Sequence, residues 1–70
     1  MMPLSLAKQG DTNYIKKISG RDDVRQHLAE LGFVVGGQVT VVSEIGGNMI
    51  LSVKDSRVAL DRGMATRIMI

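Results

Sequence analysis

Residues 28–42, LAELGFVVGGQVTVV, contain the change from a helical to a strand pattern that decides the fold. Upstream, Val24, Leu28 and Leu31 recur at the four-then-three spacing that places side chains on one face of a helix. Gly32 stands where a residue with left-handed backbone would close that helix. Further on, two consecutive glycines predict a turn, and the valines after them alternate with polar residues as in a half-buried strand. A short helix is therefore expected to lead directly into a sheet.

The residues before this helix predict one turn and one strand. Residues 4–7 alternate between leucine and a small residue, which indicates a short extended segment before a turn at residues 9–11. Residues 12–18 predict a strand, and the uneven spacing of its apolar side chains indicates a bulge or an early end. Ser19 is the expected cap of a helix that spans about residues 22–31.

The residues after the helix predict a series of short strands. The strand over residues 38–45 is expected to place Val39, Val41 and Ile45 on one side. We then expect a glycine turn, a strand over 49–54, a tight turn at 55–56, a strand over 57–61, a helical turn near 61–64 and a last strand over 65–70. This order predicts a mainly β fold, a small barrel of five to six short strands that closes on itself, with one short α-helix between the early strands.

The length and composition indicate a single domain over residues 1–70. With no cysteine, the chain has no disulfide to supplement a small core. It shows no basic leader and no run of about 20 apolar residues, so we expect a cytoplasmic protein without membrane insertion. The formal charge of +2 is small, and Tyr14 and Phe33 are the only aromatic residues, which argues against nucleic acid as a partner. A nucleic-acid-binding small barrel stays an alternative that salt-dependent binding would reveal.

No catalytic constellation stands out in the sequence. The chain has one histidine, no cysteine and no carboxylate pair at an informative spacing, so a nucleophile with its base and orienting group is missing. The pairs Gly36-Gly37 and Gly46-Gly47 lack the spacing and the following Lys-Ser or Lys-Thr of a phosphate-binding loop, and hairpin turns account for them. We therefore expect a protein that is not an enzyme.

The chain resembles the ferrous iron transport protein A family of small SH3-like proteins from about residue 4 to residue 70. The most specific part is residues 28–39, where a helix end, Leu-Gly, a few apolar residues and a glycine precede a strand. Val58-Ala59-Leu60 and the closing residues 65–70 support the resemblance. One departure is Val35, where family members often have a proline, so the loop conformation is the part of the resemblance in question.

The resemblance implies an SH3-like barrel that acts as a cytoplasmic accessory protein of bacterial ferrous-iron uptake. Its implied partner is a membrane iron permease that carries its own GTPase domain, through which the protein would lie at the inner membrane. Docking, modulation of the nucleotide cycle and holding the transporter together are the candidate roles. An alternative is a metal-responsive module like the SH3-like domains that end metal-dependent repressors. The absence of the preceding repressor domains favours a separate accessory protein.

Three residues of the expected helix could bind a metal. Asp23, His27 and Glu30 are four and three residues apart, so they could project near one another, and this donor set suits a divalent transition metal such as ferrous iron or zinc. A solvated or ion-paired helix surface is the more common outcome for such residues. We expect no required cofactor and at most a weak metal site.

The corner after the helix is the predicted partner-binding surface. In a protein this small some apolar side chains stay exposed, and basic side chains at their rim could bind acidic residues of a partner. The predicted partner-binding residues are Phe33, Val34, Val35, Val42, Arg25, Arg57 and Arg67. The alternative is that the apolar members only complete the core. We expect a monomer or a weak homodimer.

Overall fold

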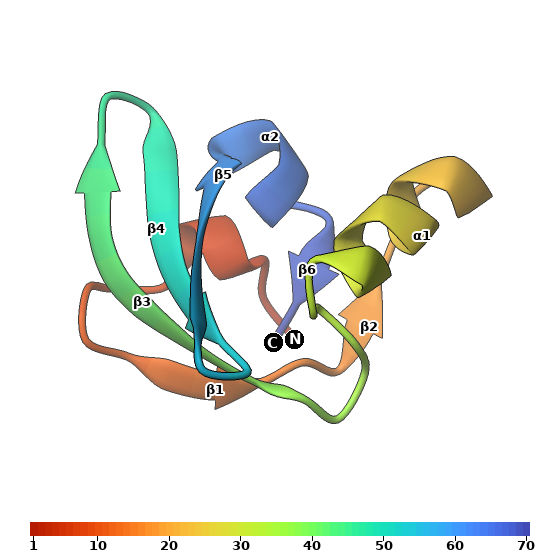
Figure 1. The fold of residues 1–70 in the computed structure, drawn as a ribbon, viewed down its shortest axis with the longest axis horizontal. Helices are drawn as coiled ribbons and strands as arrows, with labels where there is room; N and C mark the ends of the chain where they lie inside the picture. Colours follow the sequence, from red (N-terminus) through yellow and green to blue (C-terminus); the bar gives the residue numbers. More distant parts are fainter.

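In the computed structural model, which describes residues 1–70, six strands form two sheets accompanied by short helical segments (Figure 1). The elements in chain order are the 3₁₀ helix η1 (Leu4–Leu6), β1 (Thr12–Tyr14), β2 (Lys17–Ile18), α1 (Asp22–Glu30), β3 (Gln38–Ile45), β4 (Asn48–Val53), β5 (Ser56–Asp61), α2 (Arg62–Ala65) and β6 (Ile68–Met69). One sheet has the strand order β1-β3-β4-β5, and the other pairs β2 with β6. All pairings are antiparallel. The prediction of a mainly β fold with one short α-helix between early strands is confirmed, and α2 is the expected helical turn.

The helix α1 ends as the glycine pattern predicts. Gly32 has φ +107°, its N–H donates to the Ala29 carbonyl at 3.0 Å, and the N–H of Phe33 donates to the Leu28 carbonyl at 2.9 Å. These two bonds make a Schellman motif, in which the last carbonyls of the helix are satisfied. Leu28 and Phe33 are both fully buried. The helix end therefore fixes where the following loop leaves the core.

The predicted Ser19 cap is wrong. The residue before the first turn of α1 is Arg21, and no side chain caps the helix there. Ser19 instead donates its N–H and its hydroxyl to the Arg67 carbonyl, at 2.8 and 3.3 Å. Gly20, with φ +116°, turns the chain between Ser19 and the helix. Ser19 therefore pairs with the segment before β6, and its hydroxyl does not cap α1.

A bulge in β3 changes which side chains face the core. Val39 and Val41 are buried as expected, but the pairing of β3 with β4 shifts between Val41 and Ser43. A bulge inverts the alternation of the residues that follow it. Ile45 is consequently 66% exposed, and the prediction that it shares the inner face with Val39 and Val41 is wrong.

Two other local predictions need correction. The segment expected to be extended at residues 4–7 forms η1, in which the N–H groups of Leu6 and Ala7 bond back to the carbonyls of Pro3 and Leu4. This turn buries Leu4 and leaves Leu6 exposed. The tight turn before β5 lies at Lys54-Asp55, one residue earlier than expected, and both residues have positive φ as a two-residue hairpin turn requires.

The sheet does not close into a continuous barrel. After β1 the backbone of Ile15 bonds with Gly36 and Gly37, and the N–H of Lys16 bonds with the Met69 carbonyl, so the chain passes from one sheet to the other. The predicted early end of the strand over residues 12–18 is confirmed. The core between the sheets and α1 is formed by Leu4, Ala7, Ile15, Leu28, Phe33, Val39, Val41, Met49, Leu51, Val53, Leu60, Ala65, Ile68 and Ile70. None of the helices has the length and apolar character needed to cross a membrane.

Candidate partner-binding groove

Three backbone hydrogen bonds hold the loop between α1 and β3. The Gly37 N–H donates to the Val34 carbonyl at 2.9 Å and closes a tight turn. The Gly36 N–H donates to the Ile15 carbonyl, and the Ile15 N–H donates to the Gly37 carbonyl, both at 2.8 Å. The loop is therefore anchored to the segment between β1 and β2. Val35 lies at the tip of the anchored turn with 65% of its surface exposed.

Beside this loop lies a shallow groove, which we call the corner groove. It has a volume of about 230 Å³ and is lined by Ile18, Arg25, Ala29, Phe33, Val34 and Val35. Five of these six residues are apolar. They come from β2, from α1 and from the loop, so the helix end and the anchored turn together shape the groove. An exposed apolar groove with one cation at its edge is typical of a surface that binds another protein.

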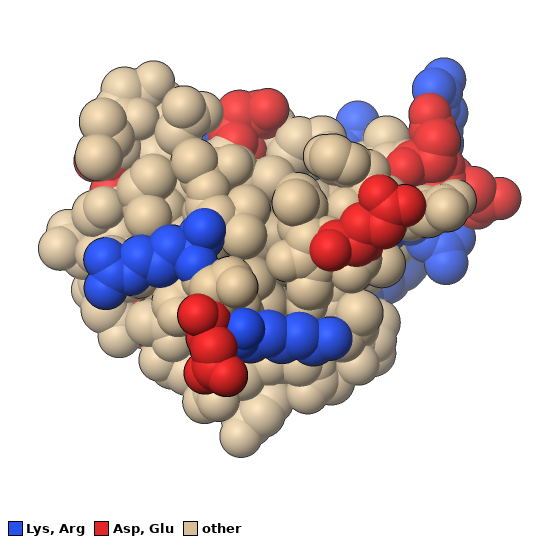
Figure 2. Space-filling model, in the orientation of Figure 1, with Lys and Arg blue, Asp and Glu red and all other residues tan.

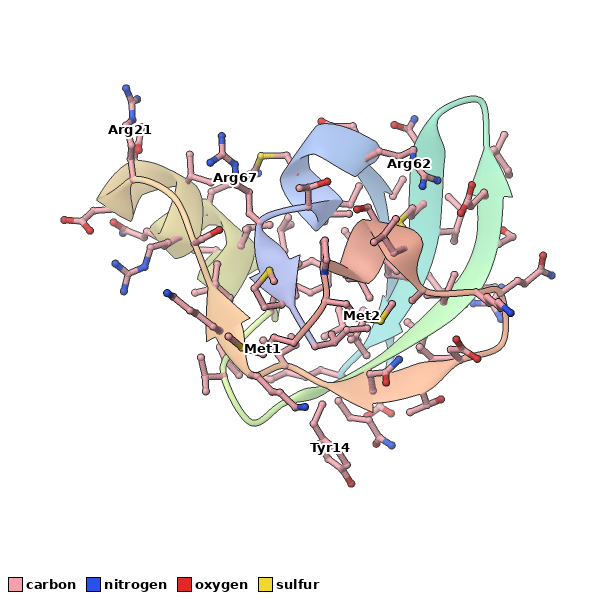
Figure 3. All side chains as sticks on the ribbon, turned by 180° about the vertical axis from the view of Figure 1, so that it is seen from behind. Met1, Met2, Tyr14, Arg21, Arg62 and Arg67 are labelled. Atoms are coloured by element: carbon pink, nitrogen blue, oxygen red, sulfur yellow. The ribbon has the colours of Figure 1, made fainter.

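Four of the seven residues predicted for partner binding line the corner groove. Val34, Val35 and Arg25 have accessible surface there, whereas Phe33 is fully buried beneath the groove and belongs to the core, as the alternative reading of the apolar members expects. The other three lie elsewhere: Val42 is half-buried at the bulge of β3, Arg57 is exposed on β5, and Arg67 is exposed between α2 and β6. The Arg67 side chain lies next to Gly20, just before α1, and Figure 3 shows it on the same side of the molecule as Arg21.

Two residues of the groove were not predicted from the sequence, Ile18 and Ala29. Ala29 is four residues after Arg25 and therefore shares its face of α1, which is a signal that the sequence contained. Ile18 had no such signal, because its place beside the helix depends on the pairing of β2 with β6.

The charged residues of α1 leave the Arg25 guanidinium accessible. Its nearest carboxylate is Asp22, at 3.4 Å, and the side chains of Arg25 and Asp22 are 55% and fully exposed. An exposed pair of this kind contributes little to stability and exchanges readily. Figure 2 shows positive and negative side chains mixed around the start of α1 rather than separated into patches. Arg25 can therefore pair with an acidic residue of a partner at the edge of the groove.

The three residues predicted to bind metal are not clustered in this structure. Asp23, His27 and Glu30 are all exposed on α1, and no three His, Asp or Glu side chains of the chain lie close enough together to hold an ion. The Asp23 carboxylate accepts hydrogen bonds from Arg21, at 3.0 Å, and from the Val24 N–H, at 2.9 Å. These bonds, that of Arg21 first, lower the pKa of Asp23 below its ordinary value. Asp23 is therefore already engaged as an ion-paired surface carboxylate.

A polar cluster on the other side of the molecule was not predicted. Arg62 donates to the Glu44 carboxylate at 2.8 Å and to the Ser5 carbonyl at 2.6 Å, and Thr66 donates to the Ser5 hydroxyl at 3.0 Å. The cluster ties η1 and β3 to α2 (Figure 3). These hydrogen bonds hold η1, β3 and α2 together, so we assign the cluster a structural role.

A second hollow, of about 290 Å³, lies on the outer face of the four-stranded sheet. It is lined by Gln38, Thr40, Ser52, Lys54 and Asp55 and has no apolar residue. Because these side chains are exposed or half-buried and solvated, the hollow offers no enclosed site for a small molecule.

Comparisons with known proteins agree with this fold. The FeoA domain model matches residues 2–70. The chain is 36% identical over 70 residues to the "Putative Fe(2+) transport protein A" of Methanocaldococcus jannaschii. The alignment covers the whole of this chain and 85% of that protein. These matches confirm the family that the sequence resembles.

Solved structures show the same architecture. The crystal structure of an iron uptake regulatory protein (FeoA) has a TM-score of 0.89 at 33% identity, covering 96% of this chain and 89% of that one. Zinc-complexed FeoA of Stenotrophomonas maltophilia, described as a procaryotic SH3 domain protein, has a TM-score of 0.86 at 27% identity. The match covers 99% of this chain and 88% of that one. A manganese-dependent transcriptional repressor has a TM-score of 0.84 at 22% identity, covering 94% of this chain and 38% of that one, and it shares the fold alone. The SH3-like fold class is confirmed.

Proposed function

This chain belongs to the FeoA domain family, and we propose that it is a cytoplasmic accessory protein of ferrous-iron transport that binds the membrane iron permease through the corner groove. The observation that carries the proposal is the exposed apolar groove with Arg25 at its edge. The partner is the GTPase-containing permease that the family resemblance implies, and the protein would lie at the inner membrane through this contact. The role requires binding and no catalysis by this chain.

The groove suits a short apolar segment of the partner that has an acidic residue next to it. Val35, Val34 and Ile18 would give the apolar contact, and Arg25 would pair with the acid. The anchored turn holds the loop in place before binding, which lowers the entropic cost of association. A groove of this size accepts only a few side chains, so the affinity should be moderate.

The test is the affinity of the Val35→Asp variant for the cytoplasmic part of the permease, measured by calorimetry. Placing an unpaired carboxylate in an apolar contact should weaken binding about tenfold or more. Ile45→Asp is the matched control, because Ile45 is 66% exposed where Val35 is 65% exposed, and it lies outside the groove. Both variants should show the circular dichroism of the folded protein. Unchanged affinity of a folded Val35→Asp variant would remove the corner groove as the docking surface.

A second measurement distinguishes modulation of the permease's nucleotide cycle from a scaffolding role. The rate of GTP hydrolysis by the permease is compared with and without the wild-type protein and the Val35→Asp variant. A rate change that the variant abolishes would indicate modulation of the nucleotide cycle, and binding without a rate change would indicate a scaffolding role.

We keep metal binding through Asp23, His27 and Glu30 as a second proposal. The observation that favours it is the zinc complex of the Stenotrophomonas maltophilia relative, whereas the side chains of this chain do not converge. Titration of zinc, and of ferrous iron under reducing conditions, tests it against the His27→Ala variant. Loss of a saturable site in the variant would support the metal proposal, and equal binding by both proteins would refute it.

A further inference from the structure

The strand β5 is a free edge of the four-stranded sheet. It is the last strand in the order β1-β3-β4-β5 and pairs only with β4. Figure 1 shows β5 at the front of the molecule, and no strand pairs with the side of β5 that is turned away from β4, where α2 and β6 are the nearest elements in this view. With six residues it is about 20 Å long, whereas β1 at the opposite edge has only three residues. An edge of this length can pair with another chain.

The backbone of β5 has hydrogen-bonding groups directed away from β4. The two-residue turn at Lys54-Asp55 is closed by the pair Val53 and Ser56. In an antiparallel ladder the bonded pairs alternate, so Arg57 and Ala59 turn their N–H and C=O groups outward. No turn or loop hydrogen bond of the chain uses these groups.

The side chains of β5 are arranged symmetrically about Ala59. Arg57, Ala59 and Asp61 are exposed on one face, and Val58 and Leu60 lie on the inner face. If a second copy pairs antiparallel with a two-fold axis at Ala59, each Arg57 lies opposite an Asp61 of the other copy and the alanines face each other. Val58 would meet Leu60 on the inner face. Such a contact is self-complementary, as a two-fold interface requires.

We propose that two copies of this chain associate through their β5 strands, so that one antiparallel sheet runs through both. Charges protect an exposed edge when self-pairing places like charges together. Here the symmetric pairing places opposite charges together, so Arg57 and Asp61 favour the contact. Asp61 accepts the Met64 N–H at one carboxylate oxygen, at 2.8 Å. Its second carboxylate oxygen is available to Arg57 of the other copy. Because only six residues of each copy meet, the dimer is weak and dissociates on dilution.

The test is the concentration dependence of the molecular mass in sedimentation equilibrium. We expect the wild-type protein to shift from monomer to dimer below about 1 mM. Ala59→Lys and Ala59→Glu each place like charges at the two-fold axis and should each weaken self-association about tenfold or more. Ala59 is exposed, so both variants should fold. An equimolar mixture of the two should form a heterodimer, because the lysine then faces the glutamate.

Tyr14→Lys is the control at the other edge of the sheet. Tyr14 is 64% exposed on β1 and points away from the body of the molecule (Figure 3), so this variant should dimerise like the wild type. The proposal is overturned if the wild-type protein stays monomeric up to about 1 mM, if Ala59→Lys dimerises as well as the wild type, or if Tyr14→Lys is the variant that loses the dimer. The corner groove is not involved, so this result is independent of permease binding.

Discussion

Replacing Gly32 by alanine tests whether the end of α1 depends on backbone conformation. Gly32 has φ +107°, which L-residues rarely adopt. An added Cβ would lie 3.5 Å from the two methyl carbons of Val53, an ordinary van der Waals distance, so space is not limiting. The cost is therefore conformational, about 1–2 kcal/mol for holding an L-residue in left-handed backbone.

This cost is large for a domain of 70 residues. Such a domain has a free energy of unfolding of about 3.5–10 kcal/mol. The loss of about 1–2 kcal/mol corresponds to a fall in the melting temperature of about 4–16 °C. We expect to see it in urea unfolding followed by circular dichroism, as a lower midpoint with an unchanged slope.

A second variant separates conformation from packing. Gly10 has φ +91° and no atom within 4 Å of the position of an added Cβ. Gly10→Ala should therefore lose a similar free energy of unfolding although its surroundings are empty. If Gly32→Ala is within about 0.5 kcal/mol of the wild type, or if only Gly32→Ala is destabilised and Gly10→Ala is not, the conformational explanation is wrong.

Three further predictions concern stability. Leu28→Ala empties a fully buried position and should lower the free energy of unfolding by about 2–5 kcal/mol in urea titrations, and a loss below about 1 kcal/mol would contradict the buried packing of α1. Asp61→Ala removes the side chain that caps α2 and should cost about 0.5–2 kcal/mol in thermal unfolding, whereas an unchanged melting temperature would show that the cap is dispensable. The hydrogen bonds from Arg21 and the Val24 N–H lower the folded-state pKa of Asp23, so its stabilisation is complete above about pH 4 and is lost as the pH falls through the lowered pKa. Asp23→Asn should reduce the pH dependence of the free energy of unfolding below about pH 4, and an identical dependence in both proteins would contradict the assignment.

The sequence predicted most elements because local and long-range preferences agree there. Val24, Leu28 and Leu31 have helical spacing, Leu28 is buried and the other two pack against the core. Met49, Leu51 and Val53 alternate and are all buried. Gly32 at the helix end, Gly36 and the pair Gly46-Gly47 have positive φ, which glycine adopts readily. In these segments the local sequence is sufficient to predict the element, since the spacing of the apolar side chains determines which face is buried.

The errors occur where a partner far away in the sequence decides the local structure. The orientation of Ile45 depends on a bulge against β4, and the pairing of Ser19 depends on Arg67, which is 48 residues away. The 3₁₀ turn at η1 is held by Arg62, 57 residues away. None of these contacts leaves a periodic signal in the nearby residues. Ile18 is missing from the predicted groove for the same reason.

The two ends of the chain lie side by side, because Met2 and Ile70 exchange both of their backbone hydrogen bonds, at 3.0 and 2.8 Å (Figure 1). A short peptide linker could join these ends, and new ends could be opened at the exposed Gly46-Gly47 hairpin tip, to give a circularly permuted protein with the same core. For the same reason, the domain could be inserted as a guest into a surface loop of a host protein with little separation of the host's two attachment points.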